Sequence, residues 1–263
     1  MTLEFSASQV SALLSCRRKY YYSSVQRLDW PEPFDRDYLK ADQLTRMGSE
    51  FHLTVQRVAQ GLLPIERAIS NADGEIQLWL QRFRDTVRLP AEGTVYAEMR
   101  LTMRQADVLW NGKIDLLTVD GGGLTIYDWK TARKAARREA YAAAPQTGLY
   151  RALAVENRVD LGLPADVFPR LRMAYWFANF PDRPIEFDDY SEAAYREDLR
   201  RLEAYAALMR SEDEADYPRT QDLKTCSWCR YRTYCRPEGP PVAFDEADFE
   251  PEPDDFLFPP DNF

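Results

Sequence analysis

The chain has 263 residues, of which 45% are apolar and 29% are charged. That length suits one large domain, and the apolar share is enough for a buried core. No apolar run reaches the length of about 18 residues that a membrane helix needs, and the first residues lack the basic and apolar segments of a secretory signal, so we expect a cytoplasmic protein with no membrane contact.

The net charge of −9 is concentrated at one end of the chain. Residues 239–263 hold eight acidic side chains and no Lys or Arg, so the remaining body is nearly neutral. A nearly neutral body can still carry a basic groove, and such a groove is what binds phosphate. The acidic total therefore does not exclude a nucleic-acid partner.

The first third of the chain has helical periodicity. Ser6 and Gln9 form a capping box at the start of the first expected helix, and Gly61 ends the second. The expected helices are residues 6–22, 41–60 and 65–88, the last with a break near 71–74.

The pattern then changes to short runs rich in Val, Ile, Leu and Tyr, separated by polar or Gly-rich turns such as 120–123. These runs predict an antiparallel meander with strands at 94–101, 108–119 and 123–129. The remaining expected elements are a helix at 145–156, a strand at 171–177 with a partner at 184–187, and a helix at 191–210. This order indicates an α/β fold with a small mixed sheet flanked by helices.

Two acidic residues lie on neighbouring predicted strands. A hairpin turning at 120–123 would bring Asp115 close to Asp128, and Lys130 would face the same side of the strand as Asp128. Two carboxylates can share a divalent cation such as Mg²⁺, which lowers the pKa of a bound water and neutralises phosphate charge. An ammonium beside them can stabilise the developing oxyanion. This set has the parts that phosphodiester hydrolysis needs.

Other polar residues flank this set. His52, the only histidine, lies on an upstream helix, and Gln146 and Tyr150 share one face of a later helix at i, i+4 spacing. A basic run between them, suited to a phosphate backbone, contains Arg133, Lys134, Arg137 and Arg138. Taken singly, the histidine reads as structural and the helix face and basic run as solvated surfaces.

The order G-x-x-x-H, G-x-I-D, D-x-K and Q-x-x-x-Y resembles the RecB-like branch of the PD-(D/E)XK nuclease superfamily. The matching pairs are Gly48/His52, Gly112/Asp115, Asp128/Lys130 and Gln146/Tyr150. The resemblance implies a restriction-endonuclease-like core in which His52, Asp115, Asp128 and the Trp129 carbonyl bind metal. It also implies that Lys130 is the catalytic lysine and that Gln146 and Tyr150 contact DNA. Glu98 lies where related nucleases often carry a glutamate.

The four cysteines follow a one-plus-three pattern: Cys16 far upstream, then Cys226-x2-Cys229-x5-Cys235. Four thiolates suit a 4Fe–4S cluster or a structural zinc, and zinc ribbons usually use two close pairs. The pattern therefore favours the cluster, with zinc or free buried thiols as alternatives. It is similar to that of iron–sulfur RecB-like nucleases, namely AddB-type nuclease domains and CRISPR-associated RecB-like exonucleases. The cluster would join the terminal segments of a nuclease domain, residues 1–238.

For residues 239–263, acidic and rich in Pro and Phe, we expect a disordered tail. The alternatives are a phosphate mimic that folds over the basic groove and a docking peptide for a partner.

The resemblance implies an exonuclease that uses Mg²⁺ or Mn²⁺ and prefers single-stranded DNA or DNA ends, in repair, recombination or CRISPR adaptation. One alternative is an accessory DNA-binding subunit with little activity, which would predict loss of Asp128 or Lys130; both are present. Another is a component that needs a partner helicase or integrase, since the chain has no Walker A sequence.

Overall fold

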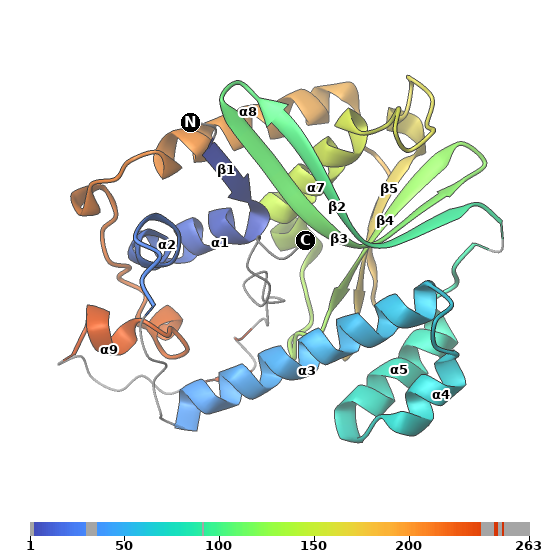
Figure 1. Ribbon diagram of the computed structural model, residues 1–263, viewed down its shortest axis with the longest axis horizontal. Coiled ribbons are helices and arrows are strands. Elements are labelled where there is room, and N and C mark those ends of the chain that lie inside the picture. The colour runs from blue at the N-terminus through green and yellow to red at the C-terminus, as the bar shows by residue number, and fades with distance from the viewer. Residues whose placement is uncertain (1–2, 30–35, 91, 238–244, 247–248, 250–263) are drawn as a thin grey trace.

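The computed structural model describes residues 3–29, 36–90, 92–237, 245–246 and 249 (Figure 1). It contains one mixed sheet of six strands. These are β1 (Leu3–Ser6), β2 (Thr94–Gln105), β3 (Val108–Asp120), β4 (Gly123–Lys130), β5 (Leu171–Phe177) and β6 (Ile185–Phe187). The predicted α/β class and the mixed sheet flanked by helices are confirmed.

Strand β3 organises the sheet. It pairs along its length with β2 in an antiparallel ladder, and the opposite edge is shared by two strands. Parallel β1 pairs with residues 108–111 of β3, whereas antiparallel β4 pairs with residues 116–120. Residues 112–115 of β3 therefore lie in a gap between β1 and β4. Parallel β5 and then antiparallel β6 extend the sheet beyond β4.

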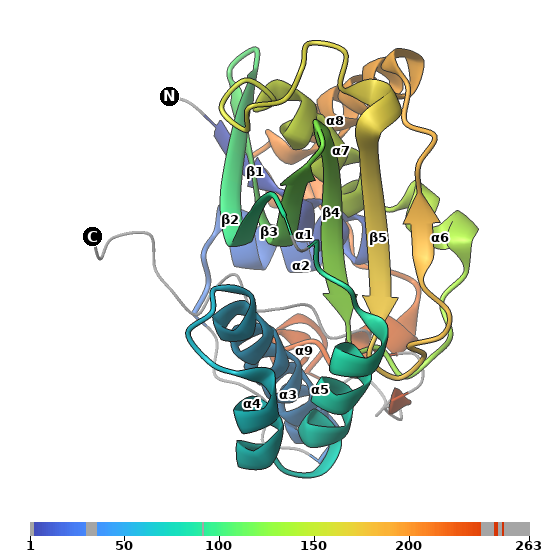
Figure 2. The ribbon, with the colours of Figure 1, turned by 90° about the vertical axis from the view of Figure 1, so that its right-hand side faces the viewer.

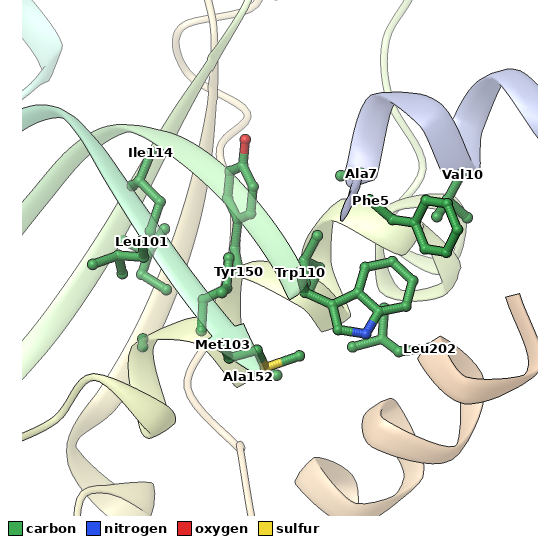
Figure 3. Packing of buried hydrophobic residues seen from close by; sticks show 14 of the residues in the cluster. Phe5, Ala7, Val10, Leu101, Met103, Trp110, Ile114, Tyr150, Ala152 and Leu202 are labelled. Carbon is green, nitrogen blue, oxygen red and sulfur yellow. The ribbon is translucent and has the colours of Figure 1, made fainter. Parts of the chain in front are cut away.

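The helices form two groups against the sheet. Helices α1 (Ala7–Ser15), α7 (Pro145–Glu156) and α8 (Glu192–Met209) pack on the main core, which includes the tilted pair of Phe5 and Trp110, with ring centroids 5.7 Å apart (Figure 3). Helices α3 (Arg36–Ala59), α4 (Ile65–Asn71) and α5 (Gly74–Thr86) enclose a second core around Phe51, Trp129 and Trp176. Figure 2 shows this second group at the end of the sheet where β4 and β5 finish.

The remaining helical segments are short: α2 (Arg17–Tyr20), the π-helical turn η1 (Tyr21–Val25), α6 (Arg138–Ala143), η2 (Phe168–Arg170), η3 (Glu214–Asp216), η4 (Leu223–Cys226) and α9 (Arg232–Cys235). Within the described residues, no helix is both long and apolar enough to cross a membrane.

The first predicted helix was wrong in its length. Its capping box is present, because the Ser6 hydroxyl accepts from the Gln9 amide and the Gln9 side chain accepts from Ser6 N–H. The helix ends at Ser15, however, because Cys16 has extended backbone angles before α2 begins. This interruption lets Cys16 line a cavity that it shares with the distant cysteine triplet.

Candidate metal centre and cysteine cavity

Three carboxylates form a row across the sheet. The register of the flanking pairs puts Glu98 of β2 opposite Asp115 of β3, and Asp115 opposite Asp128 of β4. Neither the Glu98–Asp115 position nor the Asp115–Asp128 position is a hydrogen-bonded pair of the ladder, so the strands separate at Asp115. The Asp115 carboxylate enters the opening, where its Oδ2 accepts a 2.7 Å hydrogen bond from the Trp129 backbone N–H.

The side-chain alternation of β3 reverses at the same place. Ile114 and Leu117 both belong to the main core, although they are three positions apart, whereas Leu116 belongs to the second core. Glu98 has a φ of +56°, a left-handed conformation that is uncommon for a residue with a side chain. Backbone strain of this kind collects at functional sites, where the surrounding structure holds it in place. The irregularity therefore aims Glu98 and Asp115 at one point.

Helix α3 brings a nitrogen ligand to this point. Potential ligand atoms of His52, Glu98 and Asp115 all lie within 4.8 Å of one another. His52 Nδ1 is 3.2 Å from Asp115 Oδ1, yet the geometry is not that of a hydrogen bond, and Nδ1 is buried without a hydrogen-bond partner. One nitrogen and two carboxylates around an unsatisfied buried atom fit a divalent cation.

Electrostatics at this point favour positive charge. Burial lowers the pKa of His52, but the nearby carboxylates, Asp115 first among them, outweigh burial and leave the pKa raised. Burial raises the pKa of Glu98, and the Asp115 charge raises it further. A bound cation would relieve this repulsion between the carboxylates of Glu98 and Asp115.

Lys130 and Asp128 form a buried pair beside the trio. Lys130 Nζ lies 2.8 Å from Asp128 Oδ1, and both side chains are buried. Gln146, at the start of α7, bridges them: Lys130 Nζ donates to its Oε1 at 2.9 Å, and its Nε2 donates to Asp128 Oδ2 at 2.6 Å. Burial, opposed by Lys130, raises the pKa of Asp128 to about 6. Asp128 and Gln146 thus fix the Lys130 ammonium next to a cluster of carboxylates.

The other residues singled out in the sequence have separate positions. Tyr150 is buried, and its hydroxyl donates to the Lys113 carbonyl at 2.8 Å, within the gap between β1 and β4. Arg133 is ion-paired with Glu75 of α5 and with Glu246. Arg137 is exposed just before α6. The structure thus brings together His52, Glu98 and Asp115, and beside them Asp128, Lys130 and Gln146, but not Tyr150 or Arg137.

Sequence reasoning missed one charged neighbour of the trio. Lys113 Nζ lies 2.6 Å from Glu98 Oε2. Its position two residues before Asp115, on the same predicted strand, was the available signal, because residues two apart share a face. Glu246, the partner of Arg133, carried no local signal, since the contact joins residues far apart in the chain.

A second site lies between the two ends of the described chain. All four cysteines line one small pocket, together with four basic side chains: Lys19, Arg219, Arg232 and Arg236. Burial raises the pKa of the Cys229 thiol to about 11 and also raises that of Cys226 and Cys235. Cys16 thus lines the same pocket as three cysteines that are more than two hundred positions away in the sequence.

The chain matches a known protein family over most of its length. A family model described as the PD-(D/E)XK nuclease superfamily matches residues 4–236. Among solved structures, a candidate exonuclease from Eubacterium rectale is similar in fold, with 12% identity, a TM-score of 0.52 and coverage of 90% of each chain. The crystal structure of SSO0001 matches with 13% identity and a TM-score of 0.44, over 90% of this chain and 87% of that one. The search of curated proteins found no match.

Proposed function

Because the chain belongs to the PD-(D/E)XK nuclease superfamily, we propose that it is a metal-dependent deoxyribonuclease that hydrolyses the phosphodiester bonds of DNA. The observation that carries this proposal is the held Lys130 ammonium beside the cluster of His52, Glu98 and Asp115. Superfamily members use divalent metals, and the residues present fit such an ion. We assign Mg²⁺ or Mn²⁺ as the working ion.

In this proposal His52, Asp115 and Asp128 hold the ion, with Glu98 as a further candidate and the Trp129 carbonyl as the backbone ligand that the resemblance implies. When bound, the ion would lower the pKa of a water and neutralise charge on the phosphate. Lys130 would donate to a phosphate oxygen as negative charge develops there, which is where a fixed ammonium helps most. Gln146 would keep Lys130 in place and restrict its rotation.

We further propose exonuclease action on single-stranded DNA or DNA ends, in repair, recombination or CRISPR adaptation. A partner such as a helicase or an integrase would deliver the substrate. The exposed Arg137 and the neighbouring Arg133 would hold the phosphate backbone. The cytoplasm is the compartment in which we expect this activity.

We also propose that the cysteine cavity holds a 4Fe–4S cluster, which would place the chain in the iron–sulfur RecB-like branch. A zinc ion bound to sulfur at 2.3 Å would require the sulfurs to lie about 3.8 Å apart. Among the described residues, no three cysteine sulfurs lie within 4.8 Å of one another. Four thiolates around one pocket suit a 4Fe–4S cluster, and the four basic side chains would offset its negative charge.

The cluster would close residues 1–238 into one nuclease domain. Iron and acid-labile sulfide assays on protein purified without oxygen test this assignment. We expect both to be present and to fall in Cys229→Ala; zinc without iron in the wild type would contradict it.

The activity is tested with end-labelled single-stranded DNA, double-stranded DNA and RNA, each with Mg²⁺, Mn²⁺ or a chelator. We expect metal-dependent shortening of DNA, with a product ladder that starts at one end. Cleavage of RNA alone, or cleavage that persists in the chelator, would contradict the proposal.

A further inference from the structure

A short part of the acidic C-terminal segment contacts the body of the protein. The structure describes Asp245, Glu246 and Phe249 of residues 239–263, and the rest of the predicted disordered tail lies outside the described residues. Phe249 is 8% exposed and packs on Ala41 and Leu44 of α3. Its ring also meets Trp228, with centroids 5.7 Å apart.

This apolar contact fixes the position of a carboxylate. The Phe249 N–H donates to the Glu246 carbonyl at 3.3 Å, so the two residues lie next to each other in space. With Phe249 seated between α3 and the cysteine triplet, the Glu246 side chain reaches two cations on separate elements. These are Lys40 of α3 and Arg133 of the loop after β4.

Both cations lie on or just after elements that carry residues of the candidate metal centre. Arg133 follows Lys130 by three positions, and that loop is held because Asn179 donates to the Thr131 and Ala132 carbonyls at 3.2 Å. Lys40 lies on the helix that carries His52. Arg133 Nε is buried without a hydrogen-bond partner, although Glu246 Oε2 is 3.3 Å away. A phosphate, with more oxygens than a carboxylate, could satisfy that donor and Lys40 together.

We propose that Lys40 and Arg133 form a binding subsite for a DNA backbone phosphate, and that Glu246 occupies this subsite until DNA displaces it. The inference rests on the proposed function, since it names how DNA reaches the same active site. Glu246 acts as an intramolecular competitor, and the Phe249 contact keeps its effective concentration high. Charge–charge competition of this kind is sensitive to salt, because each phosphate contact releases counterions.

The test measures affinity for a fluorescent single-stranded DNA at several salt concentrations, in a chelator so that no cleavage occurs. The variants are full-length Glu246→Gln, Lys40→Gln and the double variant. Asp261→Asn is the control, because it removes an equal charge from the far end of the same segment.

We expect Glu246→Gln to bind DNA about two- to fivefold more tightly, the range for releasing a partly exposed ion pair. Asp261→Asn should bind like the wild type. Lys40→Gln should weaken binding more in the Glu246→Gln background than alone, because in the wild type the loss of a phosphate contact is offset by release of Glu246. In that background it should also reduce the slope of log affinity against log salt by about 0.7, the value for one phosphate contact on single-stranded DNA.

Equal affinities for the wild type and Glu246→Gln would overturn the competition while leaving the nuclease intact. Equal tightening by Glu246→Gln and Asp261→Asn would also overturn it, because only the net charge would then matter. If neither the wild type nor Glu246→Gln binds DNA, the proposed function fails together with this inference.

Discussion

Gln146 accepts a 2.9 Å hydrogen bond from Lys130, and the same amide donates to the carboxylate beside that lysine. A glutamine in this position can accept from the ammonium and donate to Asp128 at once. Glutamate and leucine lack one or both of these capacities. The resemblance to RecB-like nucleases assigned Gln146 to DNA contact, whereas its contacts here support a positioning role.

Gln146→Leu should lower kcat about 10- to 100-fold, the range for losing hydrogen bonds to charged groups. The KM for DNA should change little, because the lost bonds lie within the protein. Steady-state cleavage with the purified variant measures both constants. A raised KM with an unchanged kcat would mean that Gln146 contacts DNA instead. Arg137→Gln is the comparison for that outcome, since loss of an exposed cation should act on KM.

Glu98→Gln should weaken Mn²⁺ binding about 10-fold or more, since it removes one of the charged groups around the cation. Titration of the protein with Mn²⁺, followed by electron paramagnetic resonance, measures the affinity. Lys113→Gln is the matched control, because it removes the 2.6 Å ion pair and keeps the carboxylate. If Glu98 serves only to pair with Lys113, the Glu98 variant will bind Mn²⁺ as the wild type does.

Gly112→Ala should reduce the free energy of unfolding by about 1–3 kcal/mol, the usual effect of overpacking. An added Cβ would lie 2.8 Å from Leu153 Cδ1 and 2.9 Å from the Tyr150 ring. The glycine of the G-x-I-D motif thus lets α7 approach the gap between β1 and β4. Urea denaturation measures the change. In a Leu153→Ala background the added methyl group has more room, so the loss should be smaller; equal losses in both backgrounds would refute the clash.

Asp198→Ala should destabilise the protein by about 3–5 kcal/mol, because it leaves a buried arginine without its counter-charge. Asp198 Oδ2 accepts from Arg151 at 3.1 Å and from Tyr190 at 3.0 Å, all three side chains being buried. Thermal unfolding followed by circular dichroism checks this. Tyr190→Phe, which removes only a hydroxyl, should lose about 1 kcal/mol. Similar small losses of stability in Asp198→Ala and Tyr190→Phe would show that the ion pair between Arg151 and Asp198 contributes little to stability.

Elements with strong local signals were predicted from sequence. The helix predicted at residues 145–156 matches α7 in both bounds, since Pro145 suits a first helical turn. The meander of β2, β3 and β4 followed from alternating apolar runs and the glycine turn at 120–123. The break between α4 and α5 followed from the polar residues near 71–74.

Features that depend on distant parts of the chain were missed. Strand β1 has four residues and exists because β3 offers it an edge, a partner more than one hundred positions away. The interruption at Cys16 has no local signal, because the helical pattern continues through it. The reversal at Asp115 contradicts simple alternation and depends on the left-handed backbone of Glu98.

In the candidate site, too, the residues with local sequence motifs were predicted, whereas their grouping in space was not. The sequence motifs identified His52, Asp115, Asp128 and Lys130, and the structure draws them to one end of the gap in β3. The local pattern could not say that Glu98, rather than Asp128, lies within 4.8 Å of His52 and Asp115. That grouping depends on where β2 and β4 separate from β3.

Lys130 and the adjacent side chains of His52, Glu98 and Asp115 form the proposed centre of DNA hydrolysis. The most direct test compares cleavage of end-labelled DNA by the wild type and Lys130→Ala in Mn²⁺, with the exposed Lys134→Ala as control. DNA binding in a chelator is measured for all three proteins. We predict that Lys130→Ala binds DNA but cleaves it about 100- to 1000-fold more slowly, a loss typical of removing one group that stabilises the transition state, while Lys134→Ala still cleaves. Cleavage by Lys130→Ala at the wild-type rate would contradict the account.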